Sequence, residues 1–307
     1  MSNRSNELKT IQSISAFHKA WGLPSPTHPL ISLVNFEDIN PKESSEAQKI
    51  VLNFYTVAIK RDFKGKFKYG QGYYDFDEGV ISFIAPGQVV EENVDHTDPI
   101  SGWLLLIHPD FLRGYELEKS IKNFGFFSYA LTEALYLSKE EEKTIENTMK
   151  SIQTESQRSI DLYSQDVMIS YLEVLFNYSN RFYNRQFITR KHVNNNILSQ
   201  LETLLQEYFK SDAPQNEGIP TVGFVASTLN ISANYLSDVL KTLTGNTAQQ
   251  YIHLALISKS KEYLTTTSLS ISEIAFLLGF EHSQSFSRLF KKKTELSPVA
   301  FRKSFKI

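Results

Sequence analysis

The sequence predicts an α+β protein with a β-rich N-terminal part, a helical middle part and an all-helical C-terminal part. Four short runs of β-branched and aromatic residues lie between residues 30 and 107, with no helical sequence between them. From residue 128 to residue 210, apolar residues recur at helical spacing. Residues 221–302 contain an internal duplication of two short helices. A chain of 307 residues is long enough for more than one compact domain.

The strand-forming runs of the N-terminal part are separated by turn-forming pairs such as Asn40-Pro41, Pro86-Gly87 and Asp98-Pro99. The runs are 30–36, 50–59, 79–85 and 102–107. Short strands without helices between them favour an antiparallel barrel or sandwich over a doubly wound sheet. The aromatic residues here either line a small pocket or, as is more usual, belong to the core. They are Tyr55, Tyr69, Tyr73, Tyr74, Phe76, Phe83 and Trp103.

Two helices are predicted in the middle part. Ser138 and Glu141 have the spacing of a capping box, which opens a polar helix running to about Ser156. A second helix is predicted over 160–187, and its apolar residues cover so much of its circumference that more than one side must be packed. One stripe consists of Ile160, Tyr163, Val167, Tyr171, Val174 and Tyr178, and the other apolar residues are Leu162, Ile169, Leu172, Leu175 and Phe176. If the barrel covers one side of this helix and a second copy of the chain covers the other, the protein is a homodimer, which is what we predict. The alternative is that both sides of the helix are buried within one chain.

The C-terminal part repeats itself. Residues 225–231 align with residues 274–280 at an offset of 49, and residues 236–241 align with residues 286–291 at an offset of 50. The second copy therefore has one extra residue just after its turn. Each copy has a short helix, a sharp turn and a second helix with apolar residues at i, i+3 and i+4. That order is typical of a helix-turn-helix, and two such motifs in tandem are much more specific than one.

The turn residues of both copies fit this interpretation. Asn230 and Gly279 stand at the ends of the first helices, and these residue types accept a positive φ most readily. Ser232 is a suitable N-cap for the second helix of the first copy. Ser270 and Glu273 have the spacing of a capping box that opens the second copy.

A connecting helix of about 18 residues is predicted between the motifs, which at 1.5 Å per residue is about 27 Å. Since a turn of DNA is about 34 Å, this helix could set two recognition helices in successive major-groove segments on one DNA face. Residues 218–307 carry a net charge of +5, and the preceding 217 residues carry −7. This asymmetry fits a nucleic-acid-binding module joined to another kind of domain. A protein-binding helical bundle is the alternative, but the outward residues are polar rather than apolar anchors.

The C-terminal third resembles the DNA-binding domain of the AraC/XylS family of transcription regulators. The stretches that carry the resemblance are ISANYLS (231–237), TGNTA (244–248), IAFLLGF (274–280), FSRLFKK (286–292) and LSPVAFR (296–302). A looser resemblance to members with a cupin-like N-terminal barrel lies in YDFDEG (74–79), FIAPGQ (83–88) and RFYNRQF (181–187). In such regulators the N-terminal domain usually receives a small-molecule signal, mediates dimerisation, or both. The resemblance therefore implies a cupin-like sensor domain joined to a DNA-binding domain.

Two residues depart from the family pattern. Glu295 stands where the family commonly has Gly before the Ser-Pro of its last motif, and Glu would be strained there if φ were positive. Asp238 stands where relatives often have an Arg that reaches DNA. An Asp side chain does not bind phosphate, although it can accept a hydrogen bond from cytosine N4. We therefore expect the first recognition helix to contribute less affinity than the second.

Groove geometry assigns roles to the recognition helices. Asn and Gln pair with adenine and Arg pairs with guanine, each contact giving about 1–3 kcal/mol of discrimination. Asn234, Gln284 and Arg288 are thus predicted base readers, with a phosphate contact as the alternative for Arg288. The other exposed positions are Ala233, Ser237, Asp238, Lys241, Ser283, Ser285 and Lys292. The predicted phosphate contacts are Ser232, Tyr235, Lys291, Lys292, Lys293 and Arg302. The predicted core residues are Leu236, Val239, Leu240, Ile274, Phe286, Leu289 and Phe290.

An enzyme is disfavoured. A metal site in a cupin-type barrel needs two or three His with a carboxylate, and the N-terminal part offers only scattered His18, His28, His96 and His108. The chain has no Cys, which excludes Cys-ligated zinc and a thiol nucleophile. Phosphate-loop, dinucleotide-turn and nucleophile-elbow motifs are absent from the sequence. We expect no catalysis, no metal and no cofactor. A cupin-type metal enzyme fused to a helical domain is the alternative.

The expected domain organisation has five parts. They are a flexible N-terminal arm (1–25), a cupin-like sensor domain (26–125), a helical dimerisation segment (126–192), the first helix and a polar loop of the DNA domain (193–220, the loop at 210–218) and the tandem helix-turn-helix (221–307). No apolar run approaches the roughly 20 residues that span a bilayer, so we expect a cytoplasmic protein. The expected partners are double-stranded promoter DNA, a small-molecule effector, a second copy and, for an activator, RNA polymerase. A regulator controlled by a protein partner is the alternative.

Overall fold

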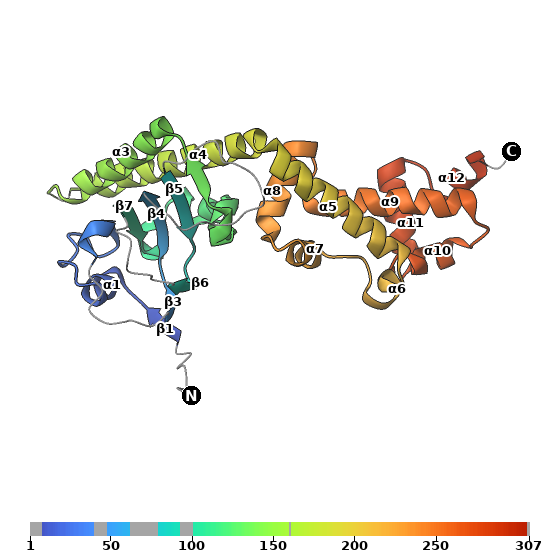
Figure 1. Ribbon diagram of the computed structural model, residues 1–307, viewed down its shortest axis with the longest axis horizontal. Coiled ribbons are helices and arrows are strands. Elements are labelled where there is room, and N and C mark those ends of the chain that lie inside the picture. The colour runs from blue at the N-terminus through green and yellow to red at the C-terminus, as the bar shows by residue number, and fades with distance from the viewer. Residues whose placement is uncertain (1–7, 40–47, 62–78, 93–100, 160, 306–307) are drawn as a thin grey trace. The chain divides into compact units, whose positions relative to one another are not determined.

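The computed structural model describes residues 8–39, 48–61, 79–92, 101–159 and 161–305. The chain divides into two compact units, Met1–Thr189 and Arg190–Ile307. The N-terminal unit is mixed α+β, and the described part of the C-terminal unit is helical (Figure 1). Some residues singled out from the sequence lie outside the described residues. They are Asn40-Pro41, Tyr69, Tyr73, Tyr74, Phe76, His96, Asp98-Pro99 and Ile160.

The N-terminal unit contains two sheets. The larger is antiparallel and has the order β2 (Ile31–Asn35), β7 (Ser101–Ile107), β4 (Tyr55–Arg61), β5 (Gly79–Ile84) and β8 (Leu135–Leu137). The smaller has the order β1 (Leu8–Ile11), β3 (Gln48–Leu52) and β6 (Val89–Glu92), and its β1–β3 pair is parallel. The four predicted strand runs are all found, and the run 50–59 is divided between β3 and β4. The antiparallel arrangement is confirmed for the larger sheet.

The two faces of the larger sheet bury different clusters, because side chains alternate along each strand. On one face Ala58 and Leu106 join Phe17 and Trp21, whose rings stack at 4.2 Å. These two rings belong to α1 (Ile14–Ala20) and its C-cap. On the other face of the sheet lies the fully buried Val57.

The N-terminal arm predicted over residues 1–25 is corrected by this packing. Residues 8–11 form β1 and residues 14–20 form α1, and Ile11, Ile14 and Phe17 are buried in the core cluster. The sequence reasoning missed these elements because both are very short. Their stability comes from contacts with β3 and β4 rather than from local pattern.

Short helical segments follow β7 and precede β8 and the two long helices of the unit. They are η2 (Pro109–Leu112), α2 (Glu116–Ser120), η3 (Ile121–Asn123), η4 (Gly125–Ser128) and η5 (Leu131–Glu133), and one further short segment, η1 (Phe36–Asp38), follows β2. Phe126 and Phe127 of η4 pack between the sheet residue Phe83 and the α4 residue Phe176. Phe83 is therefore a core residue, which is the more usual of the two roles expected for the aromatic residues.

Helix α3 (Lys139–Ser156) begins at the predicted capping box, in which the Ser138 hydroxyl accepts from Glu141 N and the Glu141 carboxylate accepts from Ser138 N. It packs against α4 (Ser164–Thr189). None of the described helices is long and apolar enough to cross a membrane.

The sequence RFYNRQF near the end of α4 fixes the edge strand β8. Gln186 accepts a hydrogen bond from Tyr136 N (2.9 Å) and donates one to Ala134 O (3.2 Å). Arg185 donates to Tyr136 O (2.8 Å) and pairs with Glu141. Edge strands have unpaired backbone groups that must find partners. In this chain the side chains of α4 provide them, so this segment has a structural role.

The C-terminal unit is a helical assembly around one apolar core. Its helices are α5 (Lys191–Lys210), α6 (Ala213–Glu217), α7 (Val222–Thr228), α8 (Ala233–Thr244), α9 (Ala248–Thr266), α10 (Ile271–Leu277), α11 (Ser283–Thr294) and α12 (Pro298–Phe305). The predicted polar loop at 210–218 is corrected, because it contains the short helix α6 with Pro214 buried. Pro at the start of a helix needs no hydrogen-bond partner for its nitrogen, which explains why it is tolerated there.

Candidate DNA-binding interface

The two predicted helix-turn-helix motifs are present and have matching lengths. Helices α7 and α10 each have 7 residues, and helices α8 and α11 each have 12. The offset is 49 between the first helices (222 to 271) and 50 between the second helices (233 to 283). The extra residue therefore lies in the connection, which is 278–282 in the second motif and 229–232 in the first. The duplication predicted from the sequence is confirmed.

The two turns are closed in the same way. Asn230 has φ 55° and Gly279 has φ 87°. The next residue donates a hydrogen bond back across the turn, Ile231 N to Ala226 O (3.0 Å) and Phe280 N to Ala275 O (2.9 Å). This six-to-one bond is the Schellman motif, which ends a helix with one left-handed residue. The predicted positive φ at both positions is confirmed.

The second helices also end alike, although their residues differ. Gly245 ends α8 at φ 74°, and Glu295 ends α11 at φ 63°. Glu295 therefore has the positive φ at which the sequence analysis expected its backbone to be strained.

Replacing Glu295 by Gly is expected to stabilise the C-terminal unit by about 1 kcal/mol, because a left-handed conformation is unfavourable for a residue with a Cβ. The reverse change at the equivalent position, Gly245→Ala, is expected to destabilise by a similar amount, since nothing lies within 4 Å of the added Cβ. Chemical denaturation of both variants measures the two effects. Equal stability of Glu295→Gly and the parent protein would contradict the strain argument.

The recognition helices present one face to the core and one to solvent. Six of the seven predicted core residues are fully buried, namely Leu236, Val239, Leu240, Ile274, Phe286 and Phe290. Leu289 is only partly buried at the edge of the same core. The opposite faces hold most of the predicted DNA-contacting residues.

On α8 the exposed positions are few. Asn234 and Lys241 are exposed, and Ser237 is half-buried. Ser232 is the N-cap, and its hydroxyl accepts from Tyr235 N at 3.2 Å. Tyr235 is only 6% exposed, which differs from its expected role as a phosphate contact. Its position next to Leu236 and four before Val239 turns the ring inward with the apolar stripe of the helix.

On α11 the exposed face is strongly cationic. Gln284, Ser285 and Arg288 are exposed, Ser283 is half-buried, and Lys291, Lys292 and Lys293 are all exposed in the last turns. Cations near a helix C-terminus are favoured by the helix dipole. The exposed charge of the two recognition helices is therefore concentrated on the second one.

Arg302 has a structural contact where the sequence analysis expected a phosphate contact. Its Nε donates to Leu264 O (3.2 Å) in the last turn of α9. The unpaired carbonyls at a helix C-terminus are favourable partners for a cation. The interaction joins residues 38 positions apart, so a local pattern could not reveal it.

His253 on α9 was missed by the sequence analysis. Its ring contacts Gln249 at 2.9 Å. Burial, and then the positive charges of Lys293 and Lys292 on α11, hold the pKa of His253 below its usual value. The side chain thus lies close enough to the cationic end of α11 to feel its charge.

The depressed pKa of His253 makes stability depend on pH. The unfolded chain takes up a proton near pH 6.5, whereas folded His253 does so only at lower pH. The stability that depends on neutral His253 is therefore fully present above about pH 6.5 and is lost as the pH falls through the pKa of His253 in the folded protein. We expect His253→Gln to lose less stability than the parent protein when thermal unfolding is compared at about pH 7.5 and 5.5. His28→Gln is the comparison variant: the pKa of His28 is also lowered by burial, but in the other unit, so this change should alter the pH response of the N-terminal unit and leave that of the C-terminal unit unchanged. A pH response unchanged by His253→Gln would contradict this account.

The described histidines of the N-terminal unit, His18, His28 and His108, have separate partners. His18 contacts Pro24 O (2.5 Å) and Ser32 Oγ (3.0 Å), and the Nδ1 atom of His108 accepts from Asp110 N (3.2 Å). His28 accepts from Leu30 N (3.2 Å). Within the described ranges, no group of three or more His, Asp or Glu side chains is gathered as a metal site would require.

Known proteins match this chain in the helix-turn-helix region. The family model described as a helix-turn-helix domain matches residues 225–304. The probable transcription factor PqrA of Proteus vulgaris is 31% identical over 114 residues, which are 37% of this chain and 86% of PqrA. The HTH-type transcriptional activator RhaS of Klebsiella pneumoniae is 31% identical over 105 residues, covering 34% of this chain and 35% of RhaS. This chain thus spans most of PqrA but about a third of RhaS.

A solved structure matches a similar share of the chain. The C-terminal domain of AraT, a response regulator from Geobacillus stearothermophilus, is 30% identical, with a TM-score of 0.32, over 36% of this chain and 87% of that one. The tandem motif and the extent of the match to PqrA lead to one conclusion about family. The chain belongs to the AraC/XylS family of transcriptional regulators.

Proposed function

We propose that this protein is a sequence-specific DNA-binding transcription regulator that inserts α8 and α11 into neighbouring segments of the major groove. The observation that carries the proposal is the pair of equal helix-turn-helix motifs on one apolar core, with an exposed cationic α11. Helix α9 between them has 19 residues. At 1.5 Å per residue it is about 28 Å long, which is close to the roughly 34 Å of one DNA turn.

The proposed base readers are Asn234 at the start of α8 and Gln284 and Arg288 on α11, all exposed. Ser237, Lys241, Ser283 and Ser285 lie on the same helices, and the proposed phosphate contacts are Ser232, Lys291, Lys292 and Lys293. Tyr235 and Arg302 are left out, because the first is buried and the second contacts Leu264 O. With its cations on α11, the second motif is expected to supply most of the salt-dependent affinity.

Genome-wide mapping of the sites bound by the protein tests the proposal, with electrophoretic binding assays at rising salt on the sites found. Discrete sites upstream of genes, bound with an affinity that falls steeply with salt, are expected. Absence of enriched sites, together with salt-insensitive or undetectable DNA binding in the assay, would overturn it. The genes beside the sites would also distinguish activation from repression, and activation would imply contact with RNA polymerase.

The N-terminal unit is proposed to be a cupin-like sensor domain that binds a small molecule in or near its sheets and thereby controls DNA binding. Its two sheets with an apolar cluster on the inner face of β4 support this assignment. DNA binding also implies a cytoplasmic protein.

Helix α4 is proposed to mediate homodimerisation. Its inner residues Leu172, Leu175 and Phe176 are fully buried, whereas Val167 and Val174 are 37% and 42% exposed. Tyr163, just before α4, is exposed, and Tyr171 and Tyr178 on the same stripe are half-buried, so this apolar face is only partly covered by the described residues of the N-terminal unit.

Introducing a charge into this stripe is expected to dissociate the dimer. The double variant Val167→Asp/Val174→Asp places two like charges in a self-complementary apolar contact, and we expect at least a tenfold weaker dimer, about 1.4 kcal/mol or more. Sedimentation velocity over a concentration series measures it. Asn180→Asp, on an exposed and different face of α4, is the matched control. A monomeric parent protein, or a dimer insensitive to the double change, would contradict the assignment.

A further inference from the structure

A cavity of about 170 Å³ opens at the end of β4 in the N-terminal unit. Tyr55 from β4, Leu112 from η2 and Ile121 from η3 provide its apolar lining. Leu112 and Ile121 are each 1% exposed, so their side chains are fixed by the core. A closed apolar cavity of about 150 Å³ holds one benzene ring, whereas this cavity of similar volume is open to solvent on its charged side. The space therefore suits a single ring or a short branched chain.

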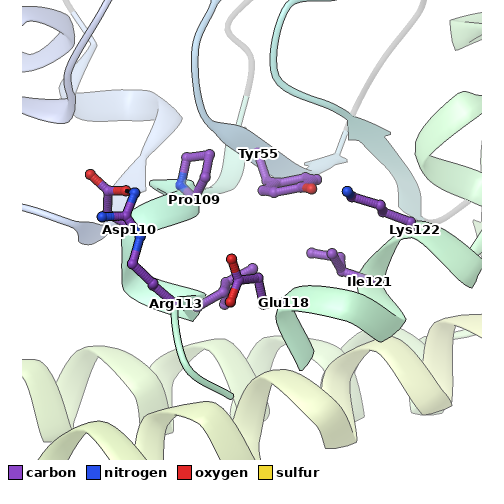
Figure 2. Close-up of a pocket in the computed structure, with 8 residues that line it drawn as sticks. Tyr55, Pro109, Asp110, Arg113, Glu118, Ile121 and Lys122 are labelled. Carbon is purple, nitrogen blue, oxygen red and sulfur yellow. Dashed lines mark hydrogen bonds and ion pairs between the residues drawn. The ribbon is translucent and has the colours of Figure 1, made fainter. Parts of the chain in front are cut away.

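The charged residues of the cavity lie at three places around it (Figure 2). Asp110 and Arg113 lie together on one side and form an ion pair with each other at 2.5 Å. Lys122 lies on the opposite side, and among the described residues it has no ion-pair partner. Glu118 lies between these two sides, and its Oε2 accepts from Gly114 N at 3.0 Å, while its Oε1 has no hydrogen-bond partner among the described residues.

The lining thus offers a ligand one unpaired cation, one carboxylate oxygen and an apolar floor. We propose that this cavity binds a small zwitterion with an apolar side chain, chemically an α-amino acid with one ring or a branched aliphatic group. The apolar group lies on Tyr55, Leu112 and Ile121, the ligand carboxylate pairs with Lys122, and the ligand ammonium pairs with Glu118. The proposal rests on the proposed function, because it names the chemical class of the effector.

The charge balance is the reason for a zwitterion rather than a simple anion. Asp110, Arg113, Glu118 and Lys122 sum to zero, so the cavity has no net attraction for a singly charged ligand. Opposite charges held apart instead favour a ligand whose own charges are separated. Burial raises the pKa of Tyr55, which keeps its hydroxyl protonated and available as a hydrogen-bond donor at the cavity wall.

Isothermal titration of the full chain with three related compounds tests the proposal. The compounds are L-phenylalanine, 3-phenylpropionate, which lacks the ammonium group, and phenethylamine, which lacks the carboxylate. We expect L-phenylalanine to bind about tenfold or more tightly than either analogue, since each charged contact adds about 1.4 kcal/mol or more. L-Leucine, with its branched chain, is expected to bind as well.

Variants locate the binding. Lys122 and Glu118 both lie on the surface, so replacing them should not disturb folding. Lys122→Ala and Glu118→Gln are each expected to weaken L-phenylalanine binding about tenfold. Lys119→Ala is the matched control, because Lys119 pairs with Glu116 at 3.0 Å and does not line the cavity. Equal affinity for 3-phenylpropionate and L-phenylalanine, no binding of either amino acid, or full affinity in Lys122→Ala would each overturn the proposal. DNA binding measured without ligand is the separate readout for the regulator function, so the two ideas fail independently.

Discussion

Gly279→Ala is expected to destabilise the C-terminal unit by about 2–5 kcal/mol, the largest single effect anticipated here. A Cβ at this position would lie 2.6 Å from Gly218 C and 2.8 Å from Pro214 O, which are both backbone atoms. The φ of +87° adds strain to this clash. Because α6 and the loop that follows it would have to move away, the second helix-turn-helix would lose its support.

The chain offers a specific way to measure this loss. Both Trp residues, Trp21 and Trp103, lie in the N-terminal unit, so Trp fluorescence follows that unit and circular dichroism follows both. In urea, Gly279→Ala is expected to lower the urea concentration at which the C-terminal helices unfold, as followed by circular dichroism. The midpoint of the fluorescence transition, which follows the N-terminal unit, is expected to stay unchanged. Gly245→Ala is the matched control, with φ +74° and open space around the new Cβ. If the two variants lost equal stability, the close approach of Gly218 to Gly279 would be refuted.

Arg288→Ala is expected to weaken binding to the mapped operator by about 10- to 100-fold, or about 1–3 kcal/mol. The guanidinium is exposed on α11, one turn after Gln284, where a recognition helix faces the groove floor. A base reader and a phosphate contact predict different patterns of loss. Loss of a base contact is confined to the cognate sequence and relaxes the preference at one base pair, whereas loss of a phosphate contact weakens binding to all DNA and lowers the salt slope by about one.

Binding of the variant to operator, mutated operator and random DNA at several salt concentrations distinguishes these outcomes. Lys210→Ala removes a positive charge from the exposed end of α5, outside both motifs, and controls for net charge. An Arg288→Ala variant that binds every DNA as tightly as the parent protein would show that α11 does not face the duplex. Equal weakening by Lys210→Ala would show that only overall charge matters.

The helix-turn-helix motifs could be predicted closely because their signals are local. Capping boxes, a left-handed residue after the first helix and apolar spacing depend on residues within a few positions of each other. The turns at Asn230 and Gly279 and the capping boxes at Ser138 and Ser270 were therefore found where they were predicted. The strand runs of the larger sheet were predictable for the same reason.

The sequence was least informative about residues whose surroundings come from distant parts of the chain. Tyr235 was predicted to contact a phosphate, yet its side chain is only 6% exposed, with the apolar stripe of α8. Arg302 was predicted to contact a phosphate, and the end of α9, far away in sequence, supplies a partner for its Nε that the sequence did not reveal. The arm at residues 8–21 joins the core because β3 and β4 lie beside it.

By itself the sequence determined that the chain has a β-rich N-terminal part, a helical middle part and a duplicated helix-turn-helix in its C-terminal third, since backbone conformation and helix capping follow from neighbouring residues. Only the tertiary structure decided which polar side chains are available to a partner, because burial depends on segments brought together by folding. The tertiary structure alone revealed the exposed cations of α11, the partly exposed apolar stripe of α4 and the cavity beside Tyr55.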